Sequence, residues 1–347
     1  MINEKQLINK NATLLDALKA LNNVGTNASL TLFVTEDDGS VIGSLTDGDI
    51  RRSLVKVGDL NVLVLEIAHR EFTYLKAGAY DVRQIHIAKE KGIELLPVLN
   101  DHMHIVDVVN LKKQKSYLPI DAVLMAGGKG ERLRPLTEKT PKPLLKVGDK
   151  CIIDYNIDRL INYGVRHLSV TVNYLKEQLE EHFSEPRGNV KVNTVREPKF
   201  LGTIGSIRFV ENIYSNTVLL MNSDLFTNID YEDFFLHFKD HDADMSIAAV
   251  PYTISVPYGI FELEGREVKC VLEKPTYNYY ANAGIYLIKK NLLNLIPDGE
   301  FFNATDFMNL LIARGYNVIR FPLNGIWIDI GNQQEYQKAQ ELVKYLK

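Results

Sequence analysis

The alternation of apolar, strand-like runs with amphipathic helical segments from residue 120 onward constrains the fold of this chain more than any other feature. In order, these segments are IDAVLMA, CIIDYNIDRLINYG, HLSVTVN, LKEQLEEHF, VKVNTV, TIGSIRFVEN and TVLLMNSD. Strands that alternate with helices in this way indicate a mostly parallel sheet. We therefore expect an α/β fold with a Rossmann-like, doubly wound sheet, which binds ligands at the carboxyl ends of its strands.

The first third of the chain contains a weak internal repeat of helix, strand, turn and strand. The first copy has apolar residues at helical spacing from Leu14 to Leu21, followed by TLFVT, the turn EDDGS and VIGSLT. The second copy has DVRQIHIAKEKG, ELLPVL, the turn NDHMH and IVDVV. This repeat predicts two copies of one supersecondary unit over residues 1–111. We expect the polar, basic segment 112–119 to be the linker to a second domain over residues 120–347.

Length and composition narrow the class of protein. A chain of 347 residues predicts two domains, and its net charge of −4 gives no general electrostatic drive toward nucleic acid or anionic membranes. The two cysteines, Cys151 and Cys270, lie far apart in the sequence and have no His or Cys at metal-ligand spacing, so neither a disulfide framework nor a zinc site is suggested. The first residues lack an apolar signal region, and we expect a cytoplasmic protein.

The loop LMAGGKGERLRPLTEKTPKPLLKVG, residues 124–148, directly follows an apolar run. Glycines in such a loop let backbone N–H groups approach a phosphate closely, because no Cβ blocks the approach. Neither GxGxxG nor GxxxxGK[ST] is present, so a different nucleotide chemistry is indicated. Arg132 follows the glycines and suits bidentate contact with phosphates, and Lys142 is a point charge on a segment stiffened by two prolines.

Two acidic residues stand where apolar strands end. Asp224 follows TVLLMN, and Asp329 lies in IWIDIGN. Mg²⁺ prefers a few carboxylates together with waters and phosphate oxygens, so the pair predicts a magnesium site. Either residue alone would also suit a helix cap.

Together with LGTIGSI, MNSD, EKP and WIDIGN, the glycine-rich loop resembles the sugar-1-phosphate nucleotidylyltransferases, or nucleoside-diphosphate-sugar pyrophosphorylases. The loop matches the signature GGxGxRLxPLTxxxPKP at nearly every defined position, and the resemblance covers residues 120–347 almost entirely. It implies catalytic roles for Arg132 and Lys142 and a metal site at Asp224 and Asp329. It implies nucleotide binding by Leu124, Ala126, Gly127, Gly128, Gly130, Asn173, Gly202 and Thr203, and sugar-phosphate binding by Gly259, Glu273, Lys274 and Asn282.

The stretch VTEDDGSVIGSLTDGDIRR resembles a CBS domain, and the two copies resemble a CBS pair, or Bateman module. The resemblance implies that Thr46 and Asp49 hold a regulatory purine nucleotide. The second copy reads DVVNLKK at the corresponding place and departs from the pattern. The alternative is that the pair serves only for dimerisation and packing, with Asp49 as a helix-capping residue. Because CBS pairs commonly associate, we expect a homo-oligomer.

The expected activity is Mg²⁺-dependent transfer of a nucleotidyl group from a nucleoside triphosphate to a sugar 1-phosphate, with release of pyrophosphate. The two-module architecture resembles the CBS-fused glucosamine-1-phosphate guanylyltransferases of the GDP-legionaminic acid route, which implies GTP and glucosamine 1-phosphate. The residues themselves leave the base open. The alternatives are guanylyl transfer to mannose or heptose 1-phosphate, and uridylyl, cytidylyl or thymidylyl transfer on the same fold. An alternative of another class is a nucleotide-sensing regulatory protein.

Overall fold

The structure is a computed structural model that describes residues 4–24, 29–78 and 80–343. The chain divides into two compact units. The first comprises Met1–Leu118 with Asn162–Gly164, and the second comprises Pro119–Ile161 with Val165–Lys347. Most of the segment that we expect to be a linker, up to residue 118, thus groups with the first unit.

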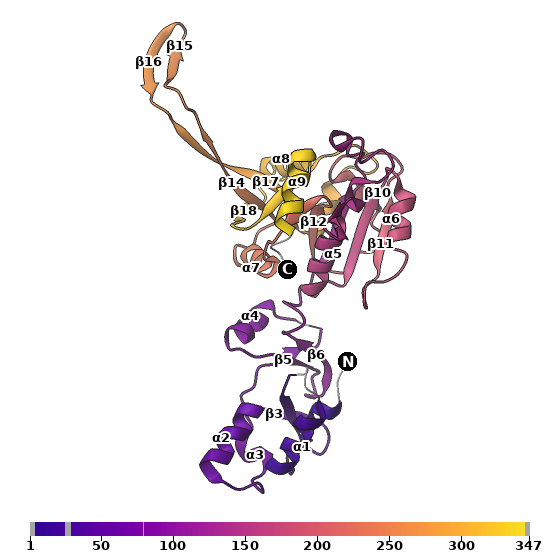
Figure 1. The fold of residues 1–347 in the computed structure, drawn as a ribbon, viewed down its shortest axis with the longest axis vertical. Coiled ribbons are helices and arrows are strands. Elements are labelled where there is room, and N and C mark those ends of the chain that lie inside the picture. The colour runs from indigo at the N-terminus through magenta and orange to yellow at the C-terminus, as the bar shows by residue number, and fades with distance from the viewer. Residues whose placement is uncertain (1–3, 25–28, 79, 344–347) are drawn as a thin grey trace. The chain divides into compact units, whose positions relative to one another are not determined.

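The first unit contains the predicted repeat (Figure 1). Its first copy consists of β1 (Leu7–Asn9), α1 (Leu14–Val24), β2 (Thr31–Thr35), β3 (Val41–Thr46) and α2 (Asp47–Val57). Its second copy consists of α3 (Val64–Ile67), β4 (Leu75–Lys76), α4 (Val82–Glu90), β5 (Leu95–Leu99) and β6 (Ile105–Asn110). In each copy a parallel strand pair is followed by an antiparallel hairpin, giving the sheets β1-β2-β3 and β4-β5-β6.

The two copies share a small hydrophobic core. Phe33 and Val41 of the first copy pack with Leu95 and Leu99 of the second, and all four side chains are buried. Each hairpin also contains an irregularity at the same point of its first strand, between Val34 and Thr35 and between Val98 and Leu99. The shared order of strand, helix and hairpin, with an irregularity at the same point of each hairpin, agrees with the predicted repeat.

The second unit is built on a seven-stranded sheet with the order β11-β10-β7-β12-β17-β14-β18. Its strands are β7 (Asp121–Ala126), β10 (His167–Val172), β11 (Val192–Arg196), β12 (Thr217–Asn222), β14 (Met245–Ser255), β17 (Thr276–Lys289) and β18 (Val318–Pro322). The strands β11, β10, β7 and β12 run parallel, whereas β17 is antiparallel to both of its neighbours. Parallel pairing therefore predominates among β11, β10, β7 and β12, the half of the sheet that contains the strand before the glycine-rich loop, as the alternation predicts.

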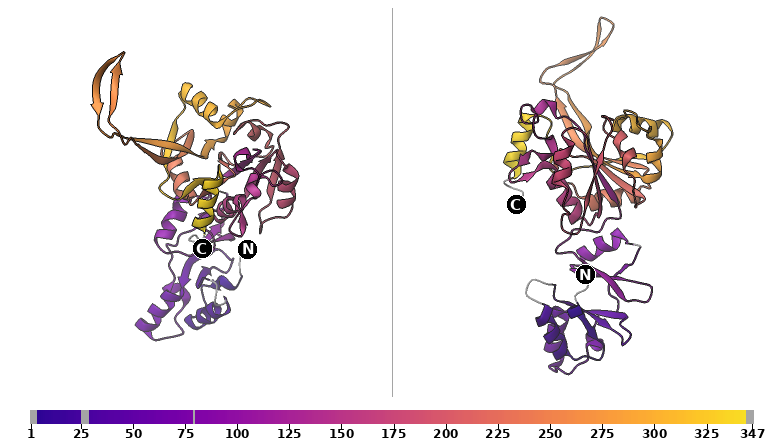
Figure 2. Two further views of the ribbon diagram at one scale, coloured as in Figure 1. Left: turned by 45° about the horizontal axis from the view of Figure 1, so that its top comes forward. Right: turned by 90° about the vertical axis from the view of Figure 1, so that its right-hand side faces the viewer.

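Helices cover the sheet, and Figure 2 shows them on both of its faces. They are α5 (Ile152–Asn162), α6 (Lys176–His182), α7 (Tyr231–Asp240), α8 (Ala304–Ala313) and α9 (Gln333–Leu342). On one face, Phe307 and Leu311 of α8 pack with Val218 and Leu220 of β12 in a common core. Residues of β12 are buried on both faces, as expected for a strand inside a covered parallel sheet.

One predicted segment departs from the sequence pattern. TIGSIRFVEN forms only the short 3₁₀ helix η4 (Gly205–Phe209) where the alternation of strands and helices calls for a longer helix. The backbone N–H groups of Ile204 and Gly205 donate to the carbonyl oxygen of Phe302, at 3.2 and 3.3 Å. These tertiary bonds tie the start of the segment to a distant loop, which the local periodicity does not reveal.

A β-arm, defined as residues 252–280, projects from the sheet (Figures 1 and 2). It consists of the outer ends of β14 and β17 and a hairpin of β15 (Ile260–Glu264) and β16 (Glu267–Leu272). Several of its large apolar side chains are exposed, including Tyr258, Phe261 and Leu263.

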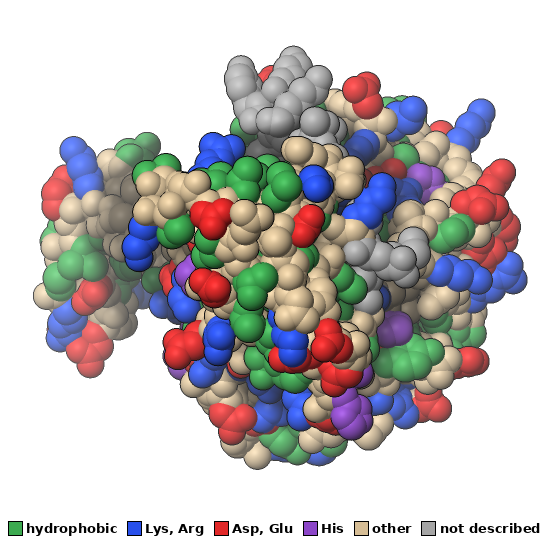
Figure 3. All heavy atoms as spheres, turned by 90° about the horizontal axis from the view of Figure 1, so that it is seen from below, with side chains coloured by type: hydrophobic (Ala, Val, Ile, Leu, Met, Phe, Trp, Pro, Cys, Tyr) green, Lys and Arg blue, Asp and Glu red, His purple; other side chains and the backbone are tan. Residues whose placement is uncertain are grey.

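The surface agrees with the mixed charge of the sequence. Figure 3 shows acidic and basic side chains interspersed over one face of the molecule. Within the described ranges, no helix combines the length and hydrophobicity needed to cross a bilayer.

Candidate active site

The glycine-rich loop begins where β7 ends and forms one wall of a cavity of about 610 Å³. Gly130 adopts a left-handed conformation with φ 63°, and a Cβ there would lie 3.0 Å from Thr137 and 3.1 Å from Lys142. The Thr137 hydroxyl donates to the Gly130 carbonyl oxygen at 2.8 Å. The loop is therefore folded tightly over the Lys142 segment, at the carboxyl ends of the parallel strands.

Most of the residues predicted for catalysis and nucleotide binding, and one of the two predicted metal ligands, line this cavity. They are Ala126, Gly127, Gly128, Gly130, Arg132, Lys142, Asn173, Gly202, Thr203 and Asp224. Leu124 does not line it, because its side chain is fully buried within β7. Its place in the strand supports the start of the loop.

Lys142 and the two predicted metal ligands form one charged cluster. Lys142 is buried at the start of the 3₁₀ helix η3 (Lys142–Leu144), and its ammonium group forms an ion pair with Asp224. Its Nζ lies 3.9 Å from Oδ1 of Asp329. The short strands β13 (Leu225–Thr227) and β19 (Trp327–Asp329) pair antiparallel, with Leu225 opposite Asp329. This ladder brings the two carboxylates together.

The donor set of this cluster suits a divalent cation. Burial raises the pKa of the Asp329 carboxyl, and the neighbouring Asp224 raises it further, while Lys142 and Arg132 oppose the rise. Oδ1 of Asp224 is buried and has no hydrogen-bond partner among the described residues. Two adjacent carboxylates, one with an unpaired oxygen, are the ligands that Mg²⁺ takes alongside waters and phosphate oxygens.

Arg132 lies in the 3₁₀ helix η2 (Glu131–Leu133), with an exposed side chain. A Cβ on Gly331, which also lines the cavity, would lie 3.2 Å from Nη2 of Arg132. The guanidinium therefore lies against the backbone that follows Asp329, where it can reach an anion in the cavity.

Glu197 is a cavity residue that the sequence reasoning missed. It directly follows β11, and only 5% of it is exposed. Thr171, Ser206 and the backbone of Leu201 hydrogen-bond its carboxylate, but burial outweighs them and raises the pKa of Glu197. Oε2 finds no hydrogen-bond partner among the residues described. A Cβ on Gly127 would lie only 2.4 Å from Oε1, so the glycine makes room for this carboxylate.

Gly202 and Thr203 also line the cavity. Gly202 has φ 80°, and a Cβ there would lie 2.6 Å from the carbonyl oxygen of Phe302. The Thr203 hydroxyl accepts a hydrogen bond from the backbone N–H of Ala304, at 2.9 Å. Thr203 is thereby tied to the first residue of α8.

The residues predicted to bind the sugar phosphate are divided between two places. Gly259, Glu273 and Lys274 lie on the β-arm, are exposed, and do not line the cavity. Asn282 lies in β17, where its side chain bonds Tyr286 and the backbone N–H of Gly284, each at 2.9 Å. A Cβ on Gly284 would lie 2.6 Å from the side chain of the cavity residue Asn222. Asn282 is therefore close to the cavity, and the other three are not.

In the first unit, Thr46 and Asp49 line a second cavity, of about 730 Å³. Thr46 is the N-cap of α2 and forms a capping box with Asp49, whose carboxylate also bonds Arg52 and His69. Burial would raise the pKa of Asp49, but the hydrogen bonds from Thr46, Arg52 and His69 outweigh it and lower the pKa. Asp49 therefore has the helix-capping role that the sequence analysis gave as the alternative to nucleotide binding. It also lines a cavity.

Comparisons with known proteins agree with this geometry. The model of the nucleotidyl transferase family matches residues 121–345, and a CBS domain model matches residues 2–56, the first repeat. Over 224 residues the chain is 27% identical to mannose-1-phosphate guanyltransferase beta-B of Xenopus laevis. Over 232 residues it is 31% identical to the bifunctional protein GlmU of Methanococcus maripaludis. Each match covers 62–63% of this chain, and the chain spans 62% and 53% of these two relatives.

Among solved structures, HddC from Yersinia pseudotuberculosis in complex with GMP-PN matches with a TM-score of 0.51 and 25% identity. The match covers 65% of this chain and 99% of the HddC chain. The fold, the cavity behind the glycine-rich loop and the family match agree, and the chain belongs to the nucleotidyl transferase family, with a CBS domain preceding the transferase fold.

Proposed function

We propose that residues 120–347 transfer a guanylyl group from GTP to a sugar 1-phosphate, with release of pyrophosphate, and that glucosamine 1-phosphate is the favoured acceptor. Residues 1–111 form a regulatory CBS pair, joined through the linker 112–119. Membership of the nucleotidyl transferase family supports the reaction class. Relatives named mannose-1-phosphate guanyltransferase support guanylyl transfer and make mannose 1-phosphate the second candidate acceptor.

The observation that carries the choice of base is the unpaired carboxylate oxygen of Glu197 in the nucleotide cavity. Guanine presents N1–H and N2–H₂ as adjacent donors, and an ionised carboxylate accepts from both. Uracil and thymine present one imide N–H between two carbonyl oxygens, which a carboxylate repels. A buried acceptor without a partner is costly, so a base that supplies both donors is favoured over one that does not.

The charged residues suit the chemistry of nucleotidyl transfer. A phosphate oxygen of the sugar attacks the α-phosphorus in line, and negative charge grows on the departing pyrophosphate. The backbone of Gly127, Gly128 and Gly130 receives the phosphates, and Arg132 neutralises the leaving group through two parallel hydrogen bonds. Lys142 holds its positive charge close to the reacting centre. Mg²⁺, when held by Asp224 and Asp329, supplies further positive charge and orients the phosphate oxygens.

The presence of a complete charged set argues against a protein that only senses nucleotides. Arg132, Lys142 and Asp224 line one cavity, and Asp329 lies beside Lys142. For the acceptor, Asn282 is the predicted sugar residue nearest the cavity. Sugar-phosphate contact by Gly259, Glu273 and Lys274, which lie on the β-arm outside the cavity, stays a prediction.

The decisive experiment is a pyrophosphate-release panel that crosses GTP, UTP, dTTP and CTP with glucosamine, mannose, glucose and heptose 1-phosphates. The expected result is Mg²⁺-dependent release with GTP. No release in any combination would refute the enzyme. Glu197→Gln should reduce the preference for GTP over UTP by about 1–3 kcal/mol, since the amide offers one acceptor in place of two. Glu211→Gln, at an exposed site, is the matched control and should leave the preference unchanged.

A further inference from the structure

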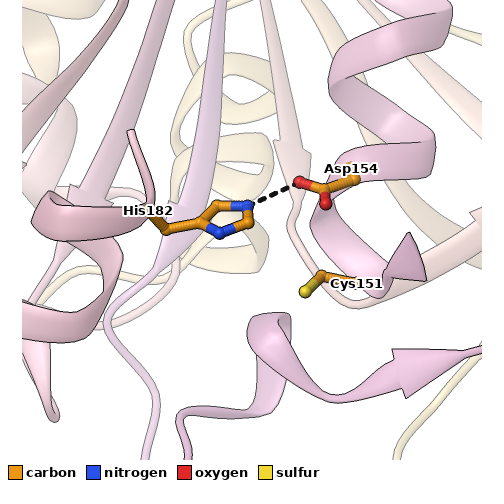
Figure 4. A group of neighbouring side chains, drawn as sticks. All are labelled: Cys151, Asp154 and His182. Carbon is orange, nitrogen blue, oxygen red and sulfur yellow. Dashed lines mark hydrogen bonds and ion pairs between the residues drawn. The ribbon is translucent and has the colours of Figure 1, made fainter. Parts of the chain in front are cut away.

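Three side chains that bind metals in other proteins converge on the second unit, away from the transferase cavity. Cys151 ends β9 (Lys150–Cys151), Asp154 lies in the first turn of α5, and His182 is the last residue of α6 (Figure 4). One donor atom from each, Sγ, a carboxylate oxygen and a ring nitrogen, lies within 4.8 Å of the others. None of the three lines the nucleotide cavity.

The site is partly enclosed. Asp154 is buried, with 12% of its side chain exposed, and His182 has 24% exposed. Nε2 of His182 lies 2.8 Å from Oδ1 of Asp154, and the two groups face each other in Figure 4. The elements β9, α5 and α6 thus deliver a thiol, a carboxylate and an imidazole to one point.

A fourth group, the guanidinium of Arg187, contacts both Asp154 and His182, and the three short contacts among these groups cannot all be hydrogen bonds at once. Nη2 of Arg187 lies 2.6 Å from Oδ1 of Asp154 and 2.8 Å from Nε2 of His182. Nε2 must carry a proton to donate to Asp154, but it must be bare to accept from Arg187. In a neutral imidazole, Nε2 cannot make both hydrogen bonds at once. In a protonated imidazole, the N–H at Nε2 would face an N–H of Arg187, and two donors repel each other.

We propose that Cys151, Asp154 and His182 form a binding site for a borderline-soft divalent cation of the Zn²⁺ class. The cation takes the lone pairs of Nε2 and Oδ1 that now compete for protons, and the Cys151 thiol releases its proton to water and binds as thiolate. Three protein ligands leave the fourth tetrahedral position to water. Thiolate and imidazole favour Zn²⁺ and disfavour Mg²⁺, so this site is chemically distinct from the pair Asp224 and Asp329.

Arg187 has other partners to which it can turn when a cation displaces it. Its Nη1 lies 3.5 Å from Oδ1 of Asp158, and its guanidinium carbon lies 5.4 Å from the centre of the Phe183 ring. In the metal-free protein the guanidinium supplies the positive charge that Asp154 requires. Arg187 and the metal therefore compete for one position.

The test is a titration of the reduced, full-length protein with Co²⁺, which replaces Zn²⁺ in such sites and reports on its ligands by absorption. We expect one equivalent to produce a thiolate-to-cobalt charge-transfer band, which Zn²⁺ abolishes and an excess of Mg²⁺ does not. Cys151→Ser should abolish the band, and Cys270→Ser, which removes the other cysteine, should retain it. Circular dichroism verifies the fold of each variant.

Two further variants separate this site from an ordinary ion-pair cluster. His182→Gln should weaken Co²⁺ binding by at least about 10–100-fold. Mutation of a residue that only hydrogen-bonds a metal ligand already causes a loss of this size. It also serves as the second test if Cys151→Ser does not fold. Arg187→Gln should strengthen binding, because it removes the competing cation. Absence of a charge-transfer band in the wild type, or its persistence in Cys151→Ser, would overturn the proposal, as would weaker binding in a folded Arg187→Gln variant.

Discussion

The ammonium group of Lys142 forms a direct ion pair with the carboxylate of Asp224, although the two residues are 82 positions apart in the chain. Lys142 is buried, and its position is stiffened by Pro141 and Pro143 on either side. A buried lysine needs a partner, and two adjacent, partly buried carboxylates are stabilised by a cation. Each group thus meets the electrostatic need of the other before substrate arrives.

We expect Asp224→Asn and Asp329→Asn each to lose most transferase activity while remaining folded, because each removes a formal charge from the proposed metal site and preserves side-chain shape. The loss should be roughly 10²–10³ in rate, as for other groups that stabilise developing charge. Pyrophosphate release over a range of Mg²⁺ concentrations measures it, with the exposed Asp298→Asn as control. Kinetics equal to the wild type at limiting Mg²⁺ would remove the residue from the metal site.

The same substitution at Asp329 should stabilise the protein in the absence of metal. The pKa of Asp329 is raised by burial and by Asp224, so the fold favours its protonated form. The stability that this proton confers is present below the ordinary carboxyl pKa and is lost as pH rises through the raised value. At pH 7 without Mg²⁺, Asp329→Asn should therefore raise Tm, and the difference should shrink toward pH 3. A lower Tm at pH 7 would contradict the assignment.

Arg132→Lys should not restore function, since one ammonium cannot reproduce two parallel hydrogen bonds to phosphate oxygens. The decrease should fall on kcat, because the contact strengthens as charge grows on the leaving group. Steady-state kinetics with saturating GTP separate kcat from KM. Wild-type kcat in the Arg132→Lys variant would show that the guanidinium does not contact the leaving group. Arg208→Lys is the control variant, because Arg208 does not line the cavity and its replacement should leave kcat unchanged.

In the first unit, Thr46→Ala should lower the free energy of unfolding by about 0.5–2 kcal/mol, because it removes the side-chain cap of α2. Thermal unfolding without nucleotide measures this structural role by itself. The Asp49 carboxylate should add to the free energy of unfolding above the ordinary carboxyl pKa, because the fold lowers its pKa. This contribution should be lost as pH falls through the lowered pKa.

We also propose that a purine nucleotide binds the cavity at Thr46 and Asp49 and tunes the transferase. Coupling of about 1–3 kcal/mol would change the apparent affinity for GTP by about 5–150-fold. Calorimetric titration of the full-length chain with AMP, ATP, GMP and GTP tests it, comparing wild type with Asp49→Ala and with Glu66→Ala, an exposed acidic control. If Asp49→Ala leaves every titration unchanged, Asp49 acts only as a capping residue.

The periodicity of apolar residues and the capping residues predicted those strands and helix ends that depend on neighbouring residues in the sequence. The strands at 121–126, 167–172 and 217–222 follow from their apolar runs, and the capping role suggested for Asp49 is present in the capping box that it forms with Thr46. The closeness of Asp224 to Asp329 depends on the short β13–β19 ladder, which carries no periodicity. The sequence indicated it only through two carboxylates at strand ends and through the family resemblance.

The remaining features depend on tertiary placement. Glu197 follows an ordinary strand, and nothing adjacent in sequence indicates that its carboxylate is buried beside Gly127. Cys151 appeared isolated because its neighbour His182 lies at the end of α6, 31 positions later. Chain topology, and not spacing, brings these groups together.

The close approach of Gly127 to Glu197 restricts the order in which mutations can accumulate. Any Cβ at position 127 would overlap the carboxylate, at 2.4 Å from Oε1. A larger residue at 127 therefore requires either that the Glu197 carboxylate moves or that position 197 becomes smaller, and both changes would disturb the group proposed to read the base. We therefore expect positions 127 and 197 to be an epistatic pair. A lineage that replaces Glu197 by a smaller residue could then accept side chains at position 127 of the glycine-rich loop that its ancestor could not.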